Sequence, residues 1–101
     1  QIVKNNKHLL KNEVELKLKH IYVLRAFNNE NYNYVIQETN WMIENYQMEF
    51  DWLLGFAYMI RGKTFDKLGM NEMALKDYKS VLKLNNYFPE IEEAKKIIKT
   101  R

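Results

Sequence analysis

Cysteine is absent from the 101-residue sequence, so neither a disulfide framework nor a thiolate metal site can form. Glycine occurs three times and proline once, and nothing in the chain resembles two strand-forming runs joined by a tight turn. The longest nearly apolar run, residues 52–60, is far shorter than the roughly 18 residues that a membrane-spanning helix needs. We therefore expect a single small all-α domain with no membrane span in this segment, and the cell compartment stays open.

Basic residues are missing from the middle of the chain, although its net charge is +3. Residues 26–60 carry five acidic residues and no lysine or arginine, whereas residues 1–25 carry six basic and two acidic residues, and residues 61–101 carry ten and six. A nucleic-acid surface needs a continuous basic stripe with stacking aromatics, and here the bases alternate with acids on helical faces. We expect no nucleic-acid partner. The charge blocks favour packing between neighbouring helices or a polar protein-binding surface.

Hydrophobic residues recur at helical spacing along the chain and predict five helices joined by short corners, over residues 7–27, 32–45, 50–68, 71–84 and 89–101. The asparagine-rich residues 28–31 stop the first helix, because asparagine tolerates the left-handed conformation and prefers helix caps. Gly69 ends the third helix, and Pro89 suits the first turn of the fifth. The corners make the helices antiparallel neighbours.

The first helix carries two adjoining apolar stripes, so we expect it to be covered on two sides. One stripe holds Leu9, Leu16, Val23 and Phe27, and the other holds Leu10, Val14, Leu18, Ile21 and Leu24. The third helix is the most apolar, and we expect it to bury its large side chains, which are Trp52, Phe56, Met59 and Phe65.

Residues 55–88 resemble the tetratricopeptide repeat, whose pattern is W-x2-L-G-x2-Y, then A-x3-F, then P. The corresponding positions hold Tyr58, Gly62, Phe65, Gly69, Ala74, Tyr78 and Val81, with Tyr58 in place of tryptophan and Val81 in place of a small residue. Gly62 and Ala74 are small where the paired helices press together, so we expect Gly62 at their closest approach. Two positions depart from the pattern, with Arg61 in place of leucine and Asn86 in place of proline.

The first hairpin, residues 7–46, matches the second, residues 50–84, only in spacing. Val35, Thr39 and Met42 fall where Ala74, Tyr78 and Val81 recur, at an offset of 39 residues (74 − 35). It is either a degenerate repeat or a helical hairpin unrelated to the repeat. The resemblance implies antiparallel helix pairs stacked as a short solenoid, with residues 89–101 as a capping helix.

Residues suited to catalysis or metal binding are few. His8 and His20 are twelve positions apart, which is not the spacing of a helical metal pair. Ser80 is the only serine and lies within a predicted helix, and no glycine-rich phosphate loop exists. We therefore expect neither an enzyme nor a bound metal or cofactor.

A groove for a partner is implied by the resemblance, because the inner face of the first helix of each tetratricopeptide pair binds peptides or helices. The residues on that face are Phe56, Met59, Lys63, Asp66 and Lys67. An apolar base with a basic rim would suit an acidic amphipathic segment. The alternative is that Phe56 and Met59 are simply buried against the first hairpin.

Tyr34 and Trp41 form a second candidate surface, seven positions apart and off the main stripe of their helix. Tyrosine and tryptophan are favoured interface anchors, and the alternative is that both pack against the first helix. Together these features predict a protein-interaction module that binds a peptide or helix of a partner protein. The alternative function is a structural domain that forms homo-oligomers.

Overall fold

The computed structural model of the chain describes residues 2–45, 51–84 and 89–101. The helices are α1 (Ile2–Asn28), α2 (Tyr32–Glu44), α3 (Asp51–Lys67), α4 (Asn71–Leu82) and α5 (Pro89–Lys99). The described residues contain no strand, which confirms the predicted all-α class. Helix α1 begins earlier than expected, and α4 ends two residues sooner. The corner near Gln47 and the predicted stop at Asn85 and Asn86 lie outside the described residues.

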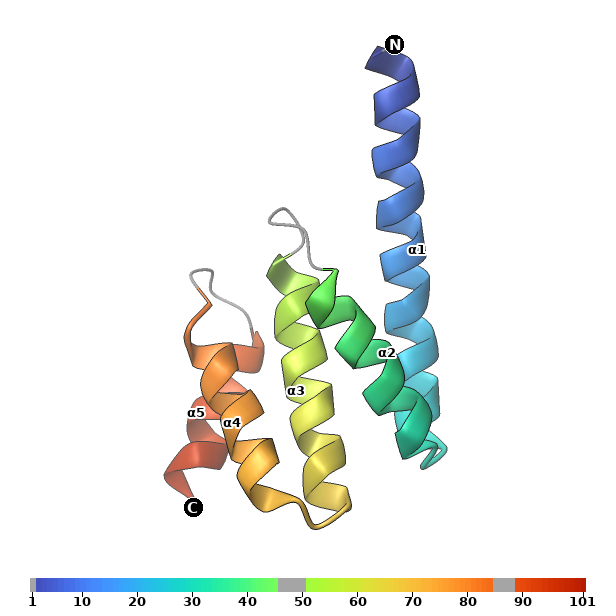
Figure 1. The fold of residues 1–101 in the computed structure, drawn as a ribbon. Helices are drawn as coiled ribbons and strands as arrows, with labels where there is room; N and C mark the ends of the chain where they lie inside the picture. The colour runs from blue at the N-terminus through green and yellow to red at the C-terminus, as the bar shows by residue number, and fades with distance from the viewer. Residues whose placement is uncertain (1, 46–50, 85–88) are drawn as a thin grey trace.

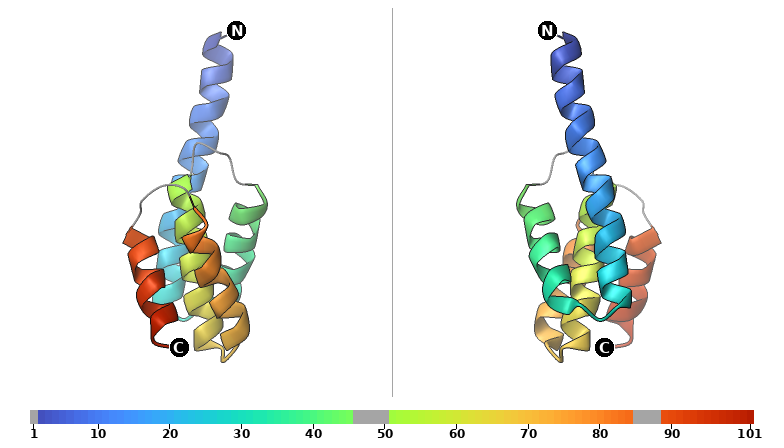
Figure 2. Two further views of the ribbon diagram at one scale, coloured as in Figure 1. Left: turned by 90° about the vertical axis from the view of Figure 1, so that its left-hand side faces the viewer. Right: turned by 90° about the vertical axis from the view of Figure 1, so that its right-hand side faces the viewer.

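Helix α3 is the centre of the fold, because it packs against each of the other four helices. Helix α2 packs against α1 and α3, and α4 packs against α3 and α5. Helices α1 and α5 therefore lie along one side of α3, and α2 and α4 along the other (Figures 1 and 2). The N-terminal part of α1 extends beyond the rest of the bundle. Within the described ranges, no helix has the length and apolar character required to cross a membrane.

The corner between α1 and α2 closes with two backbone hydrogen bonds. The Asn31 N–H donates to the Ala26 carbonyl at 2.8 Å, and the Glu30 N–H donates to the Phe27 carbonyl at 3.1 Å. This pair of bonds is the Schellman motif, which requires one residue in the left-handed conformation. That residue is Glu30, with φ +61°, and not one of the asparagines, which corrects the sequence-based expectation.

The corner between α3 and α4 repeats this geometry. The Met70 N–H donates to the Phe65 carbonyl at 2.8 Å, and the Gly69 N–H donates to the Asp66 carbonyl at 3.0 Å. Gly69 lies at this helix end, as the sequence predicted, and takes the left-handed conformation with φ +77°. Each donor and acceptor lies 39 positions after its counterpart in the first corner (70 − 31, 65 − 26). The two hairpins therefore share one turn design.

Two hydrophobic clusters meet along α3. One joins α1, α2 and α3 around Val23, Val35 and Ala57, and the other joins α3, α4 and α5 around Met59, Tyr78 and Ala94. A Cβ atom added at Gly62 would lie 2.7 Å from Cε1 of Tyr78, so the ring of Tyr78 on α4 packs directly on Gly62 of α3. Trp52 departs from the prediction, because it is 38% exposed at the N-terminal end of α3.

Candidate protein-interaction surface

One side of α1 is apolar and exposed. Leu16, Val23 and Ala26 are buried against α2 and α3. Five large apolar residues among the described side chains of the helix are between 38% and 53% exposed, and they are Val14, Leu18, Ile21, Tyr22 and Leu24. The expectation that both stripes of this helix are covered is therefore wrong for its described side chains. We define the outer face of α1 as Val14, Leu18, Ile21 and Tyr22.

The positions on α3 that are equivalent to the outer face of α1 are in contact with other helices. Their equivalents, 39 residues later, are Leu53, Ala57, Ile60 and Arg61. Leu53, Ala57 and Ile60 are buried in the cluster that α3 forms with α1 and α2. Arg61 donates to Asn40 of α2. On α3, the residues at these positions therefore pack against the preceding helix, α2. On α1, the residues at the equivalent positions are exposed to solvent.

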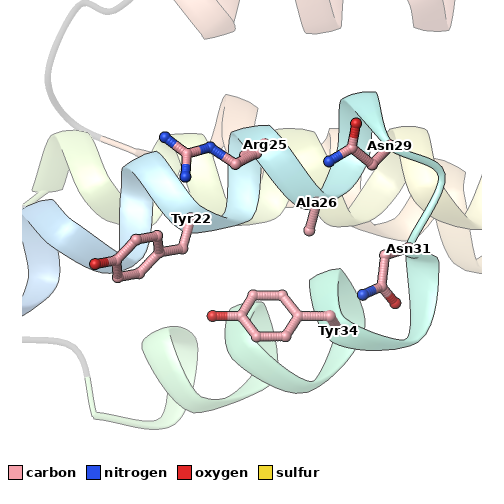
Figure 3. A pocket seen from close by; sticks show the side chains of 6 residues that line it. All are labelled: Tyr22, Arg25, Ala26, Asn29, Asn31 and Tyr34. Atoms are coloured by element: carbon pink, nitrogen blue, oxygen red, sulfur yellow. The ribbon is translucent and has the colours of Figure 1, made fainter.

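A hollow of about 250 Å³ lies beside the outer face, between α1 and α2 (Figure 3). We call it the open hollow. Its lining residues come from the end of α1, the corner and the start of α2, and they are Tyr22, Arg25, Ala26, Asn29, Asn31 and Tyr34.

A second hollow, of about 430 Å³, lies between α2 and α4, and residues of α3 also line it. Its lining residues are Ile36, Asn40, Arg61, Phe65, Met70, Met73, Lys76 and Asp77. Four of these are the equivalents of Tyr22, Ala26, Asn31 and Tyr34 in the open hollow. Ile36 and Asn40 belong to α2, and no helix in the described part of the chain supplies their counterparts at the open hollow. The open hollow is therefore lined by equivalent residues to those of the second hollow, but it lacks the side that α2 forms in the second hollow.

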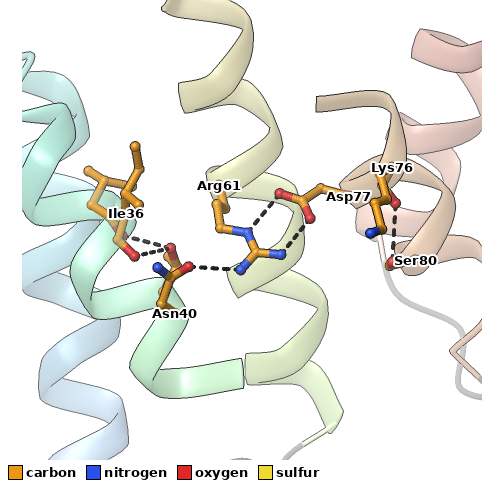
Figure 4. Close-up of polar contacts among 8 residues, drawn as sticks. Ile36, Asn40, Arg61, Lys76, Asp77 and Ser80 are labelled. Carbon is orange, nitrogen blue, oxygen red and sulfur yellow. Dashed lines mark hydrogen bonds and ion pairs between the residues drawn. The ribbon is translucent and has the colours of Figure 1, made fainter. Parts of the chain in front are cut away.

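Arg61 ties three helices together at the base of the second hollow (Figure 4). Its Nε and Nη2 donate to the two carboxylate oxygens of Asp77 at 2.8 and 2.7 Å, and its Nη1 donates to Oδ1 of Asn40 at 2.8 Å. Asp77 is only 3% exposed. The hydrogen bonds that Arg61 donates to Asp77 raise the pKa of Arg61, and burial opposes this shift. Sequence reasoning missed this network, although Arg61 stood out as a departure from the repeat pattern.

The predicted groove on α3 has no exposed apolar base. Phe56 is 7% exposed and Met59 is 4% exposed, so both belong to the core and their assignment as partner-binding residues is corrected. The Phe56 ring packs against His20 of α1, with centroids 4.0 Å apart. Burial lowers the pKa of His20, and the charge of Glu90 opposes the shift.

The polar rim of that groove faces α5. Lys63 pairs with Glu93 at 2.5 Å. Asp66 accepts a hydrogen bond from the Tyr78 hydroxyl at 2.7 Å and also pairs with Arg101. Lys67 is exposed. Lys63 and Asp66 therefore contact the C-terminal part of the chain. Lys67 instead lines a hollow with Phe27, Asn28, Glu30 and Tyr32 at the first corner.

Tyr34 and Trp41 are both partly buried against the first cluster. The Lys19 ammonium lies 4.6 Å from the centre of the Trp41 ring, and Lys19 also pairs with Glu38 at 2.6 Å. Trp41 is therefore partly covered by α1, which agrees with the alternative that it packs against the first helix. Tyr34 lies at the open hollow, so the two residues do not form one exposed patch.

Known proteins give no guide to this surface. No family model matches the chain, and neither the curated proteins nor the solved structures contain a match. Across residues 2–45, 51–84 and 89–101, no group of three or more histidine, aspartate or glutamate side chains is arranged to hold a metal ion.

Proposed function

We propose that this chain is a protein-interaction module that binds a helix of a partner protein on the outer face of α1. One observation carries the proposal. The positions through which α3 packs on α2 recur on α1, where no helix of the described ranges covers them. The shared corner geometry and the close approach of Gly62 to Tyr78 also support a stacked arrangement like that of the tetratricopeptide family.

An estimate of the binding free energy shows how much of the surface such a partner must contact. Burying the remaining half of a valine, leucine or isoleucine side chain stabilises a complex by about 1 kcal/mol. Val14, Leu18 and Ile21 together would supply about 3 kcal/mol, whereas a micromolar complex needs about 8 kcal/mol. The outer face alone is therefore too small. A docked helix must also fill the open hollow and use polar contacts at its edge.

The two alternatives have weaker support. A groove along α3 would need Phe56 and Met59 at the surface, and both are buried. A homo-oligomer would pair the outer face of α1 with the same face of a second copy, and light scattering of the chain tests this alternative. The other large hydrophobic residues that are exposed in the described ranges are Leu24, Trp52, Leu68, Met70, Met73 and Leu82. Apart from Leu24, they are divided between the two ends of the α3–α4 hairpin.

A displayed library of amphipathic helical peptides, selected against the whole chain, tests the proposal without assuming a partner. We expect selected peptides to lose binding to Leu18→Lys + Ile21→Lys and to keep binding to the control Met73→Lys + Leu82→Lys on α4. All four side chains are exposed, so both double variants should melt within about 1 kcal/mol of the parent. Selected peptides that bind both variants equally would place the binding surface elsewhere.

A further inference from the structure

We propose that His20 makes the contact between α1 and α3 sensitive to pH, so that protonation of its imidazole loosens α1 from α3 in mild acid. Histidine is the side chain that changes charge most readily near neutral pH. Two geometric observations carry the proposal. The imidazole packs against aromatic rings of α3, and one of its nitrogens is buried without a hydrogen-bond partner.

His20 belongs to the side of α1 that packs on α3. It lies about one turn from Leu16 and about one turn from Val23, and both of those residues are buried. Its ring centre is 4.0 Å from that of Phe56 and 5.7 Å from that of Trp52, and it meets Trp52 edge to face. The imidazole therefore contacts α3 through apolar ring surface.

The Nδ1 atom of His20 is buried and makes no hydrogen bond. A neutral imidazole tolerates this, because one of its two nitrogens carries no proton. An imidazolium has a proton on both nitrogens, so protonation would leave a buried, charged N–H without an acceptor. Such a group costs more free energy than an unpaired neutral one. The contact with α3 therefore favours the neutral ring.

Neighbouring charged groups on α1, α2 and α3 do not supply the missing acceptor. Glu38 of α2 pairs with Lys19 of α1. Lys63 lies two turns after Phe56 on α3 and pairs with Glu93 of α5. Lys63 can only donate hydrogen bonds, and so can Lys17, which precedes His20 by about one turn on α1.

Glu90, at the start of α5, is the acidic group whose charge acts on His20. Burial has the larger effect and lowers the pKa of His20, whereas Glu90 raises it. In the unfolded chain the pKa returns to its ordinary value of about 6.5. Above about pH 6.5 the ring is neutral in both states, so the contact contributes its full stability. As the pH falls below that value, the unfolded chain takes up the proton first and stability is lost.

Helix α1 is the part of the fold that this loss would release. It packs only against α2 and α3 among the described helices, whereas α3 also packs against α4 and α5. The sequence has no histidine after His20, so the second hairpin has no equivalent group. Proteins open in cooperative units of unequal stability. We therefore expect mild acid to loosen α1 and to leave the packing of α4 on α3 intact.

Urea denaturation at about pH 7.5 and about pH 5.5 tests the proposal, because ordinary carboxylates stay ionised across this interval. We expect the urea midpoint of the whole chain to fall on acidification. His20→Gln, which cannot take up a proton, should lose at least half of this fall, and the matched control His8→Gln should keep it. Glu90→Gln should enlarge the fall, because it removes the charge that favours the imidazolium. An equal fall in His20→Gln and the parent would overturn the proposal.

Two measurements on the parent chain keep the proposal testable if His20→Gln does not fold. In an NMR titration, the His20 ring should change protonation state below about pH 6.5, and a midpoint at or above that value would overturn the proposal. Amide hydrogen exchange, corrected for its intrinsic pH dependence, should show protection lost in α1 and kept in α4. Equal loss in both helices would show global unfolding and overturn the local release of α1. Neither measurement needs a partner, so both are independent of helix docking on the outer face.

Discussion

The two hairpins of this protein share a turn but are held together differently. Both corners are Schellman motifs, and Val35 and Ala74 occupy equivalent buried positions after them. In the second hairpin, Gly62 admits the ring of Tyr78, and Arg61 is bound to the buried Asp77. The turn geometry therefore sets the shared shape, whereas the strength of each hairpin depends on what fills the space between its helices.

The first hairpin has neither of these contacts. Val23 stands where Gly62 recurs, and Thr39 stands where Tyr78 recurs, with its hydroxyl bonded to the Val35 carbonyl of its own helix at 2.7 Å. Its one cross-hairpin ion pair among the described residues, Lys19 with Glu38, is partly exposed. We expect the hairpins to respond unequally to equivalent substitutions.

The largest difference should come from the two equivalent acidic residues, Asp77 and Glu38. Asp77→Ala strands the guanidinium of Arg61 in a mostly buried site and should cost about 3 kcal/mol of unfolding free energy. Glu38→Ala removes a partly exposed pair and should cost about 1 kcal/mol or less. Urea denaturation of both variants measures the two losses. Equal losses would show that the Arg61 network adds nothing special to the second hairpin.

Enlarging Gly62, on which the Tyr78 ring packs, should have the next largest effect. Gly62→Leu must displace the Tyr78 ring and should cost about 2 kcal/mol or more. Val23→Leu, at the equivalent position, adds a single methylene and should cost about 1 kcal/mol. Thermal and urea melts of the two variants measure both losses of stability. A neutral Gly62→Leu variant would contradict the close packing of α3 on α4.

The smallest effects should come from the corners, and they should have opposite signs. Glu30→Gly relieves a side chain in the left-handed conformation and should stabilise the chain by about 0.5 kcal/mol, because the entropic cost of glycine offsets part of the gain. Gly69→Ala imposes that strain and should destabilise by about 1 kcal/mol. Melts of the two variants beside the parent protein show whether each substitution stabilises or destabilises the chain. Shifts in the same direction would mean that the two corners are not equivalent.

The sequence predicted the helices because local signals define them. Hydrophobic spacing located all five, Gly69 fixed one corner through its left-handed conformation, and Pro89 begins α5. The first corner was assigned to asparagine because Asn is the commoner left-handed residue. Glu30 adopts the conformation because the two hydrogen bonds of the corner require it at that position.

The site could not be predicted, because it depends on which helix lies against which. Phe56 and Met59 share a helical face with Lys63, and only the positions of α1, α4 and α5 decide that the apolar pair is buried and the lysine is not. The stripe of Val14, Leu18 and Ile21 was visible in the sequence. Its exposure was not, since a stripe of this kind is usually covered.

Arg61 also couples the two hairpins thermodynamically. It belongs to the second hairpin, but one of its three side-chain hydrogen bonds goes to Asn40 in the first. Opening the first hairpin alone would leave Nη1 without that acceptor, so the cost of local unfolding on one side includes a loss on the other. This is the nearest-neighbour energy that makes stacked helical units unfold together, and here a single guanidinium supplies part of it.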